Sequence, residues 1–514
     1  MQELEALLGI VLVAVLLAGL ARCVGAPYPI FLALGGAALA FLPGAPSVIV
    51  PPELALALFV APVLLDAAYD ASPRDLLDNW APLTALVVFA VGLTTAAVAV
   101  VVRSLLPEMP LAPAIVLGAL VAPPDAAAAT AVLRPLRPPH RILTILEGES
   151  LLNDASALLI YRLAVAAVAT NGFSIGTVAP VFLLSVAGSL VAGPALGWIF
   201  VRVLLPVQHV PTAIVLSFIS TFSIWIVAEH VGLSGVLTMV SYAMVLAQTL
   251  PGRVPARLRI PTYAVWETVV FLMNVLAFIF IGLQIRPALA GLKDSDQMRY
   301  LAVAGAVLLT VIVVRVAWYM AYNWMVRWLH RRRGYQPIRP LLKPTAGSGL
   351  IISWAGMRGI LSLAAAMALP AGFPYRDLIV LTAFAVVLGT LVIQGLTLKP
   401  LLRSLRLEDD DPVGREVRAA RDAALQAALA TFEHDRTAVA EAIRQEFAAQ
   451  MTAARREDSA SGDASHFAIR KSALQAARGV VITMRTTQEI GDDAFHLIEE
   501  ELDWLEMAGR EEGD

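Results

Sequence analysis

Residues 121–127 read Val-Ala-Pro-Pro-Asp-Ala-Ala, and they lie inside an apolar stretch near residues 111–133. A stretch of this length can span a bilayer as a helix. The two prolines remove backbone donors and clash with carbonyls of the preceding turn, so they should interrupt that helix. In lipid, an interrupted helix is tolerated only where it is buried in protein or lines a cavity. Because Asp125 follows the prolines directly, we expect a carboxylate at a broken helix within the membrane.

Similar apolar stretches recur along the chain, which is 58% hydrophobic and only 15% charged, whereas a soluble protein is about a quarter charged. The single cysteine, Cys23, excludes a disulfide framework and a cysteine-rich metal site. The expected fold is an all-α polytopic membrane protein with about 13 transmembrane helices. These candidates lie near 5–22, 28–42, 53–70, 80–103, 111–133, 143–170, 177–205, 211–229, 233–249, 265–286, 299–327, 348–370 and 376–400.

The loops between these stretches differ in charge. One alternate set carries about 18 basic residues and the other about five, and basic loops remain in the cytoplasm. We therefore expect an integral protein of the cell membrane with its N-terminus outside and its C-terminus in the cytoplasm.

The chain changes character after the last apolar stretch. From Leu407 onward there are about 24 acidic and about 12 basic residues, whereas the preceding part is basic overall. We divide the chain into a transmembrane domain, 1–405, and a soluble helical cytoplasmic tail, 406–514, with a loop at 459–465. Phe495, Ile498, Leu502 and Leu505 form one apolar helical stripe. A regulatory role is expected for the tail, and the sequence does not indicate its partner.

The sixth apolar stretch carries the polar run Glu-Gly-Glu-Ser-Leu-Leu-Asn-Asp at residues 147–154. Helical spacing places Ser150 and Asp154 on one face together with Glu147. Hard monovalent cations prefer oxygen ligands, and this face offers carboxylate and hydroxyl oxygens. Asn153, on the neighbouring face with Glu149, provides an amide that does not ionise. A site with an amide at this position has one titrating group fewer than a site with a second carboxylate. It can therefore exchange one cation for one proton without a change in charge.

Asp66 adds a carboxylate to the third apolar stretch. It is either a further ligand or gate of the same site, or a carboxylate at the membrane interface.

Two arginines also fall within apolar stretches, Arg315 in the eleventh and Arg358 in the twelfth. An arginine within the membrane is expected to pair with a carboxylate. We expect Glu149 to pair with Arg358, with Glu147 or Asp125 as alternatives. These arginines are predicted to be structural clamps, since a like charge repels a cation, and Arg162 is a candidate third clamp.

A second interruption is expected where Gly356 and Gly359 flank Arg358. The two interrupted stretches are about seven spans apart, which fits three-helix units of opposite topology, formed by the fourth to sixth and the eleventh to thirteenth stretches. Broken helices that cross at the membrane midplane in such inverted repeats form a binding centre.

Three runs carry a resemblance to a known family: residues 123–130, residues 147–154, and Trp-Ala-Gly-Met-Arg-Gly at 354–359 followed by Leu-Ser-Leu-Ala. They resemble the signatures of the monovalent cation:proton antiporter family 1, which contains bacterial Na⁺/H⁺ antiporters and eukaryotic sodium/proton exchangers. Lesser matches at 266–267, 280–284 and 392–397 extend the resemblance over nearly all of residues 1–405.

The resemblance implies a homodimer in which core helices, near 80–170 and 299–400, move like an elevator against dimerisation helices near 1–70 and 177–286. It implies that Asp125 and Asp154 bind the ion and exchange the proton, with Ser150 as a further ligand. Because Asn153 precedes Asp154, the chain resembles the members of the electroneutral Asn-Asp type. The resemblance also implies that Glu149 and Arg358 form a stabilising pair. Asp66 stands where many members carry glutamate. Pro124 stands where several members carry threonine, which removes a hydroxyl ligand. Thr130 or a backbone carbonyl could take the place of that hydroxyl.

The expected function is secondary active exchange of Na⁺, with Li⁺ as a second candidate cargo, for H⁺ in a one-to-one ratio, serving pH and sodium homeostasis. The protein is expected not to be an enzyme, to need no cofactor and to bind no nucleic acid. K⁺/H⁺ exchange on the same scaffold is the nearest alternative, because ligand type does not separate Na⁺ from K⁺. A cation channel and a membrane sensor acting through the tail are more distant alternatives.

Overall fold

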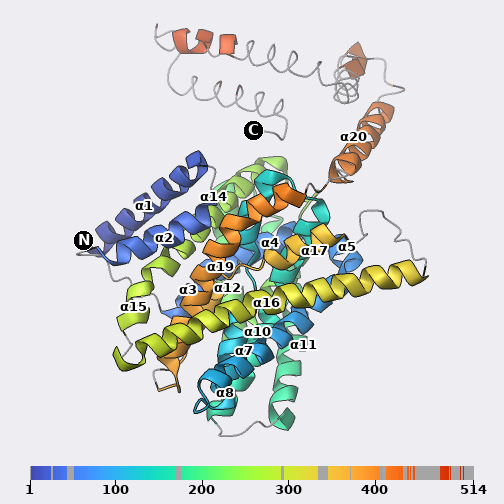
Figure 1. Cartoon of the computed structure of the whole chain (residues 1–514). Helices are drawn as coiled ribbons and strands as arrows, with labels where there is room; N and C mark the ends of the chain where they lie inside the picture. The colour runs from blue at the N-terminus through green and yellow to red at the C-terminus, as the bar shows by residue number, and fades with distance from the viewer. Residues whose placement is uncertain are drawn as a thin grey trace. The chain divides into compact units, whose positions relative to one another are not determined.

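The computed structural model describes residues 2–24, 27–42, 51–169, 175–290, 294–333, 345–370, 372–405, 407 and 412–431, with isolated positions between 434 and 502. Among these residues every regular element is a helix (Figure 1). The chain forms two compact units, Met1–Asp410 and Asp411–Asp514. The predicted loop at 459–465 and the stripe residues Phe495 and Leu505 lie outside the described residues.

The helices of the first unit follow the apolar stretches. Their bounds are α1 (Gln2–Val24), α2 (Tyr28–Ala40), α3 (Pro52–Ala55), α4 (Ala61–Asp70), α5 (Pro73–Asp78), α6 (Trp80–Thr84), α7 (Val91–Leu105), α8 (Leu111–Val121), α9 (Ala126–Leu133), α10 (His140–Ala169), α11 (Ile175–Leu204), α12 (Val210–His230), α13 (Gly235–Thr249), α14 (Ala256–Leu283), α15 (Ile285–Ala290), α16 (Asp294–Arg333), α17 (Ala346–Trp354), α18 (Ile360–Met367) and α19 (Arg376–Leu405). In the second unit, α20 spans Pro412–Thr431.

Eight helices in the described part of the chain are long and apolar enough to cross a membrane. The molecule is therefore an all-helical polytopic membrane protein, while the finer count of about 13 stays a prediction. Helix α14 begins before the predicted stretch 265–286 and ends at Leu283, whereas α16 extends beyond the predicted stretch 299–327 at both ends. Hydropathy marks only the apolar part of a helix, and the polar turns at either end remain helical.

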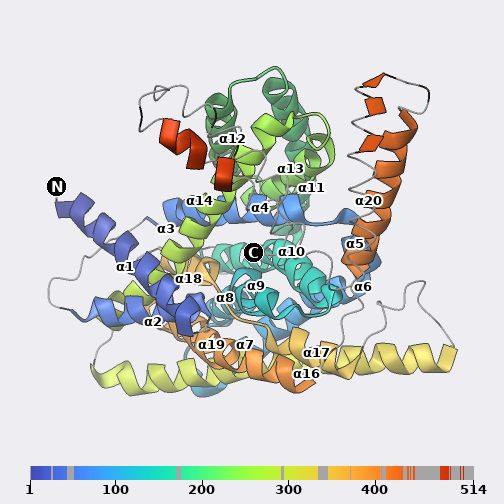
Figure 2. The ribbon, with the colours of Figure 1, turned by 90° about the horizontal axis from the view of Figure 1, so that it is seen from above.

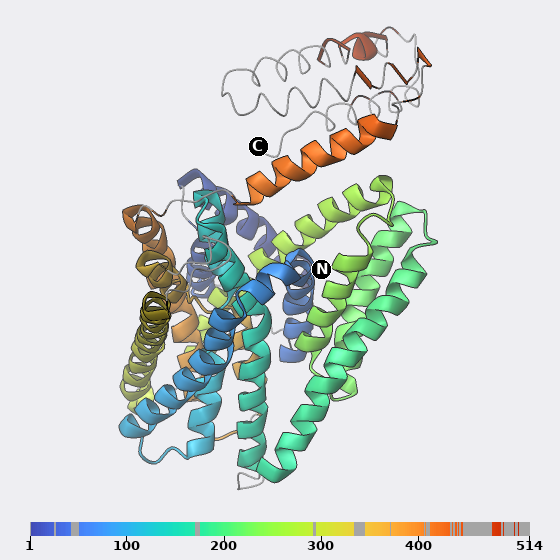
Figure 3. The same ribbon diagram turned by 90° about the vertical axis from the view of Figure 1, so that its right-hand side faces the viewer.

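The helices of the first unit pack in two groups. Helices α7, α8, α10 and α16–α19 contact one another, and α4 and α11–α14 form the second group. Figures 2 and 3 show α11–α13 set apart from α7, α8 and α16. Helix α10 belongs to the first group and also contacts α4 and α13 of the second. The site described below lies where the two groups meet.

Helix α2 packs closely against α14 through two glycines. A Cβ atom at Gly36 would overlap the Ile279 carbonyl oxygen, and one at Gly282 would overlap the Ala33 carbonyl oxygen. Small residues allow helix backbones to approach closely in membrane proteins, where van der Waals packing drives helix association.

Candidate cation site

Two helix interruptions meet at the centre of the candidate site. Helix α8 ends at Val121 and α9 begins at Ala126, so the break predicted at the prolines is present. Helix α17 ends at Trp354 and α18 begins at Ile360, so the break predicted around Arg358 is present as well. The Asp125 amide donates a hydrogen bond of 2.7 Å to the Met357 carbonyl oxygen, which joins the two breaks.

Arg358 binds the backbone that the breaks expose. Its Nε donates to the Val121 carbonyl oxygen at 3.0 Å and its Nη2 to the Ala122 carbonyl oxygen at 3.2 Å. Its Nη1 donates to the Gly356 carbonyl oxygen in its own break. The side chain is 1% exposed. A buried carbonyl without a donor is costly, so this guanidinium stabilises the C-terminal end of α8 and ties it to the second break.

Asn153 satisfies another carbonyl of the first break. Its Nδ2 donates to the Pro124 carbonyl oxygen at 2.8 Å, and the residue is fully buried. Its Oδ1 has no hydrogen-bond partner among the described residues. The amide therefore holds the break through its donor and keeps a buried acceptor next to the candidate site.

Asp125 and Asp154 line one cavity of about 70 Å³ between α4, α9, α10, α14 and α18. The Asp125 carboxylate caps α9 by accepting a hydrogen bond of 2.8 Å from the Ala127 amide. Ser150 also lines the cavity, and its Oγ accepts from the Ala126 amide at 3.2 Å. The cavity thus brings together three of the predicted ligands, with oxygen atoms of the kind that a hard monovalent cation prefers. In the described part of the chain, no group of three or more His, Cys, Asp or Glu side chains is placed to hold a metal ion.

Glu149 pairs with Arg315, and this corrects the expected pairing with Arg358. The two guanidinium nitrogens of Arg315 donate to the two carboxylate oxygens of Glu149 at 2.5 and 2.8 Å. The side chains are 3% and 1% exposed. Arg315 also donates to the Ser353 and Ile352 carbonyl oxygens at the end of α17. The pair therefore links α10 and α16 to the helix end before the second break.

The remaining predicted residues lie away from the cavity. Asp66 is half-buried on α4 and does not line it, and its charged neighbours are Asp70, Arg134 and Glu267. Glu147 forms a 2.9 Å ion pair with Arg134, so it is not the partner of Arg358.

Thr130 and Arg162 have other partners as well. The Thr130 hydroxyl donates to the Ala126 carbonyl oxygen in its own helix. Arg162 forms a half-exposed 2.9 Å ion pair with Glu229 of α12.

Two polar residues of the cavity have no role in the sequence-based prediction, Asn274 of α14 and Ser362 of α18. Asn274 is an isolated amide in the run Phe-Leu-Met-Asn-Val-Leu at residues 271–276. A polar residue in an apolar span is a usable signal for a buried function. Ser362 lies in a run that carries the family resemblance, but nothing in that run indicates that its side chain faces the cavity.

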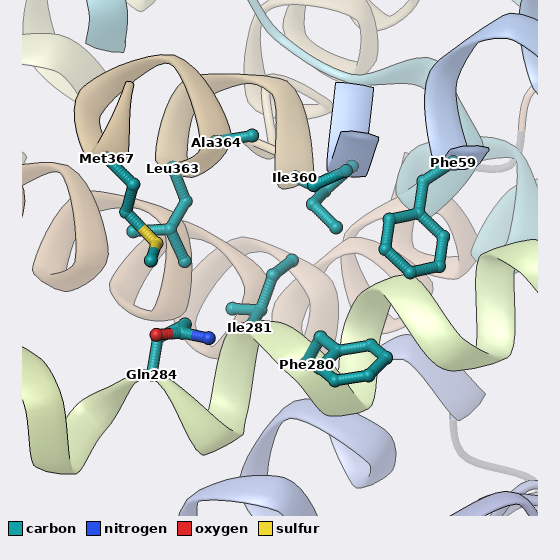
Figure 4. Close-up of a pocket in the computed structure, with 9 residues that line it drawn as sticks. Phe59, Phe280, Ile281, Gln284, Ile360, Leu363, Ala364 and Met367 are labelled. Carbon is teal, nitrogen blue, oxygen red and sulfur yellow. The ribbon is translucent and has the colours of Figure 1, made fainter. Parts of the chain in front are cut away.

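A second, apolar cavity of about 30 Å³ adjoins the first, and Phe59 and Ile360 line both. Figure 4 shows these two side chains near Phe280, with Gln284 and Met367 farther away. The rings of Phe59 and Phe280 pack at 5.6 Å between centroids. Phe59 and Ile360 thus present apolar side chains to both cavities.

Gly359→Ala should impair the site directly, because a Cβ atom at this position would overlap the carboxylate of Asp125. Overpacking costs about 1–3 kcal/mol, and we expect the rate of cation-dependent proton movement in proteoliposomes to fall about tenfold, since about 1.4 kcal/mol corresponds to that factor. Gly305→Ala on α16 is the matched control, because its new Cβ would meet open space. Equal rates for the two variants would contradict the tight fit at Asp125.

Comparisons with known proteins agree on one family. The family described as "Sodium/hydrogen exchanger, transmembrane" matches residues 10–404. An uncharacterized Na(+)/H(+) exchanger of Mycobacterium tuberculosis (strain ATCC 25618 / H37Rv) is 32% identical over 93% of this chain and 91% of its own length. The sodium, potassium, lithium and rubidium/H(+) antiporter of Bacillus subtilis (strain 168) is 30% identical over 68% of this chain and 54% of its own length.

A solved structure supports the same fold. The sodium proton antiporter MjNhaP1 from Methanocaldococcus jannaschii at pH 8 aligns with a TM-score of 0.57 and 17% identity, over 79% of this chain and 99% of the other. Since the matched family covers most of the sequence, the chain belongs to the sodium/hydrogen exchanger family, a family of integral membrane transporters that exchange monovalent cations for protons.

Proposed function

We propose that this protein exchanges Na⁺ for H⁺ in a one-to-one, electroneutral cycle at the cavity shared by Asp125 and Asp154. The observation that carries the proposal is the placement of these two carboxylates and Ser150 around one cavity at the junction of two broken helices. A buried carboxylate is costly as a bare charge, so it favours a bound proton or a bound cation. The two cargoes then compete for the same oxygens.

The buried amide of Asn153 supports the one-to-one ratio. It lies beside Asp154 in the chain, where a second carboxylate would add a proton-binding group, and its donor is engaged by Pro124. An amide does not titrate. Exchange of one proton for one cation leaves the charge of the site unchanged, and only this compensated site would cross the membrane at low cost.

The movement we propose is a displacement of one helix group against the other. The core would comprise helices near 80–170 and 299–400, and the dimerisation part helices near 1–70 and 177–286. Inverted repeats are supported by the order of elements, in which a broken helix followed by a continuous one occurs twice: α8, α9 and α10, and then α17, α18 and α19. The same proposal includes a homodimer, about 13 membrane spans and an N-terminus outside the cell. It also includes a regulatory cytoplasmic tail, 406–514, ligation or gating by Asp66, and a role in pH regulation.

A proteoliposome assay tests the cation and the stoichiometry together. Dye-reported proton movement would be measured with Na⁺, Li⁺ and K⁺ across pH, with and without an imposed membrane potential. We expect Na⁺ and Li⁺ to drive exchange at rates that the potential does not change. A rate that depends on the potential would contradict the one-to-one ratio, and cation current without a proton gradient would indicate a channel.

K⁺/H⁺ exchange is the second candidate, and the Bacillus subtilis relative, named as a sodium, potassium, lithium and rubidium/H(+) antiporter, favours it. The oxygen ligands of the cavity do not by themselves discriminate between the two cations. Exchange driven by K⁺ at least as fast as by Na⁺ in the same assay would establish this alternative.

A further inference from the structure

The C-terminal turns of α16 carry an exposed surface of tryptophan and arginine side chains. Trp324 is 61% exposed and Trp328 is 41% exposed, and their rings stack at 6.4 Å between centroids. The Arg332 guanidinium lies over the Trp328 ring at 4.2 Å from its centroid. Arg331 is exposed one turn beyond Trp328. Residues at these spacings share one side of a helix, which we call the Trp-Arg surface.

This surface begins where α16 leaves the helix bundle. One residue before Trp324, the buried Asn323 donates from Nδ2 to the carbonyl oxygen of Thr345, the N-cap of α17, at 2.8 Å. Beyond this point α16 projects past α17 (Figures 1 and 2). Helix α16 has 40 residues, which corresponds to about 60 Å, roughly twice the thickness of the hydrocarbon core. Because charged side chains are costly inside the hydrocarbon core, we place the arginine-rich end of α16 at the level of the lipid head groups or outside them.

The C-terminal end of α16 carries basic residues and no acidic residue. Residues 327–333 read Arg-Trp-Leu-His-Arg-Arg-Arg, and the only acidic residues of α16 are Asp294 and Asp296 at its other end. Neither Arg331 nor Arg332 forms an ion pair with any residue that the structure describes. Tryptophan favours the interface between water and lipid, and arginine binds phosphate oxygens in a bidentate manner.

We propose that the Trp-Arg surface is a binding site for the head group of an anionic phospholipid. The guanidinium groups of Arg331 and Arg332 contact the lipid phosphate, while Trp324 and Trp328 hold the glycerol region and the first acyl carbons. The stacking of Arg332 on Trp328 orients the guanidinium before the lipid arrives, which reduces the entropy lost on binding. A neutral phospholipid lacks the net charge that this surface complements.

Native mass spectrometry of the full chain tests the proposal with an equimolar mixture of phosphatidylglycerol and phosphatidylcholine. We expect the wild type to retain phosphatidylglycerol preferentially. The variant R331Q/R332Q should lose about 25-fold in that preference, since each basic residue near an anionic surface contributes about a factor of five. Trp328→Ala should weaken the preference as well, because the platform under Arg332 is removed.

The variant R253Q/R257Q is the matched control. It removes the same charge from two exposed arginines, Arg253 between α13 and α14 and Arg257 in the first turn of α14, and the preference should stay within about twofold of the wild type. An equal loss in both variants would overturn the proposal, because it would show attraction to net charge alone. Equal retention of the two lipids by the wild type would also overturn the proposal. That result would be obtained if the acidic tail of this chain, and not a lipid, occupied the Trp-Arg surface.

Discussion

Asp154→Asn is expected to abolish exchange, with a rate at least about 100-fold below that of the wild type. Asparagine preserves the volume of the side chain but neither binds a proton nor carries a negative charge. A cation held without its counter-charge in the membrane interior costs about 2.5–3.5 kcal/mol, which corresponds to a factor on the order of 100. The measurement is Na⁺-driven, dye-reported proton movement in proteoliposomes, normalised to the amount of protein incorporated.

Two features of the structure make this variant decisive. Asp154 lines the cavity together with Asp125, and the carbonyl oxygens of the first break are held by Asn153 and Arg358 and not by Asp154. The substitution should therefore remove exchange without unfolding the break. Asp377→Asn is the control, because this carboxylate is exposed at the start of α19 and lies outside the cavity. Exchange by Asp154→Asn within a few-fold of the control would refute the assignment.

Glu149→Gln is expected to destabilise the protein by about 3–5 kcal/mol, the cost of leaving one partner of a buried ion pair without its counter-charge. Arg315 would remain almost fully buried with a neutral amide in place of the carboxylate that accepts two of its hydrogen bonds. We expect a clear decrease in the unfolding temperature of the detergent-solubilised protein, measured by fluorescence-detected size-exclusion chromatography after heating.

Glu147→Gln is the matched control for this prediction, since Glu147 lies two residues earlier on α10 and pairs with Arg134 near the surface. Exposed pairs contribute about 0–1 kcal/mol, so its unfolding temperature should stay close to that of the wild type. The double variant Glu149→Leu/Arg315→Met should recover part of the lost stability, because apolar residues can replace a buried pair at little cost. If Glu149→Gln unfolds at the wild-type temperature, the buried pair is not a structural clamp.

The partner of Glu149 shows where prediction from sequence stopped. Arg358 and Arg315 are both arginines in apolar stretches, so hydropathy and charge treat them alike. The structure separates them because Arg358 reaches the carbonyl oxygens at the end of α8, while Arg315 faces α10. A choice between two guanidinium groups depends on how three distant helices are aligned, and no local pattern contains that information.

The lining of the cavity shows the same limit. Asp125, Asp154 and Ser150 were predicted together, because a proline break and helical spacing are local properties of the chain. Asn274 and Ser362 come from α14 and α18, and their side chains face the cavity only through the packing of those helices around α10. Asp66 has the chemistry of a ligand, yet it lies on α4 outside the cavity lining.

Hydropathy and local residue patterns were therefore enough to predict the membrane-spanning character of the chain, both helix interruptions, and Asp125 and Asp154 as buried carboxylates. Hydrophobicity, proline and glycine act on the chain within a few residues, so their consequences can be read locally. Only the packed helices show that Arg358 satisfies broken-helix carbonyls, that Arg315 pairs with Glu149, and that Phe59 and Ile360 line both cavities. These outcomes depend on contacts between helices that are far apart in the chain, where side-chain packing and the satisfaction of buried polar groups select one arrangement.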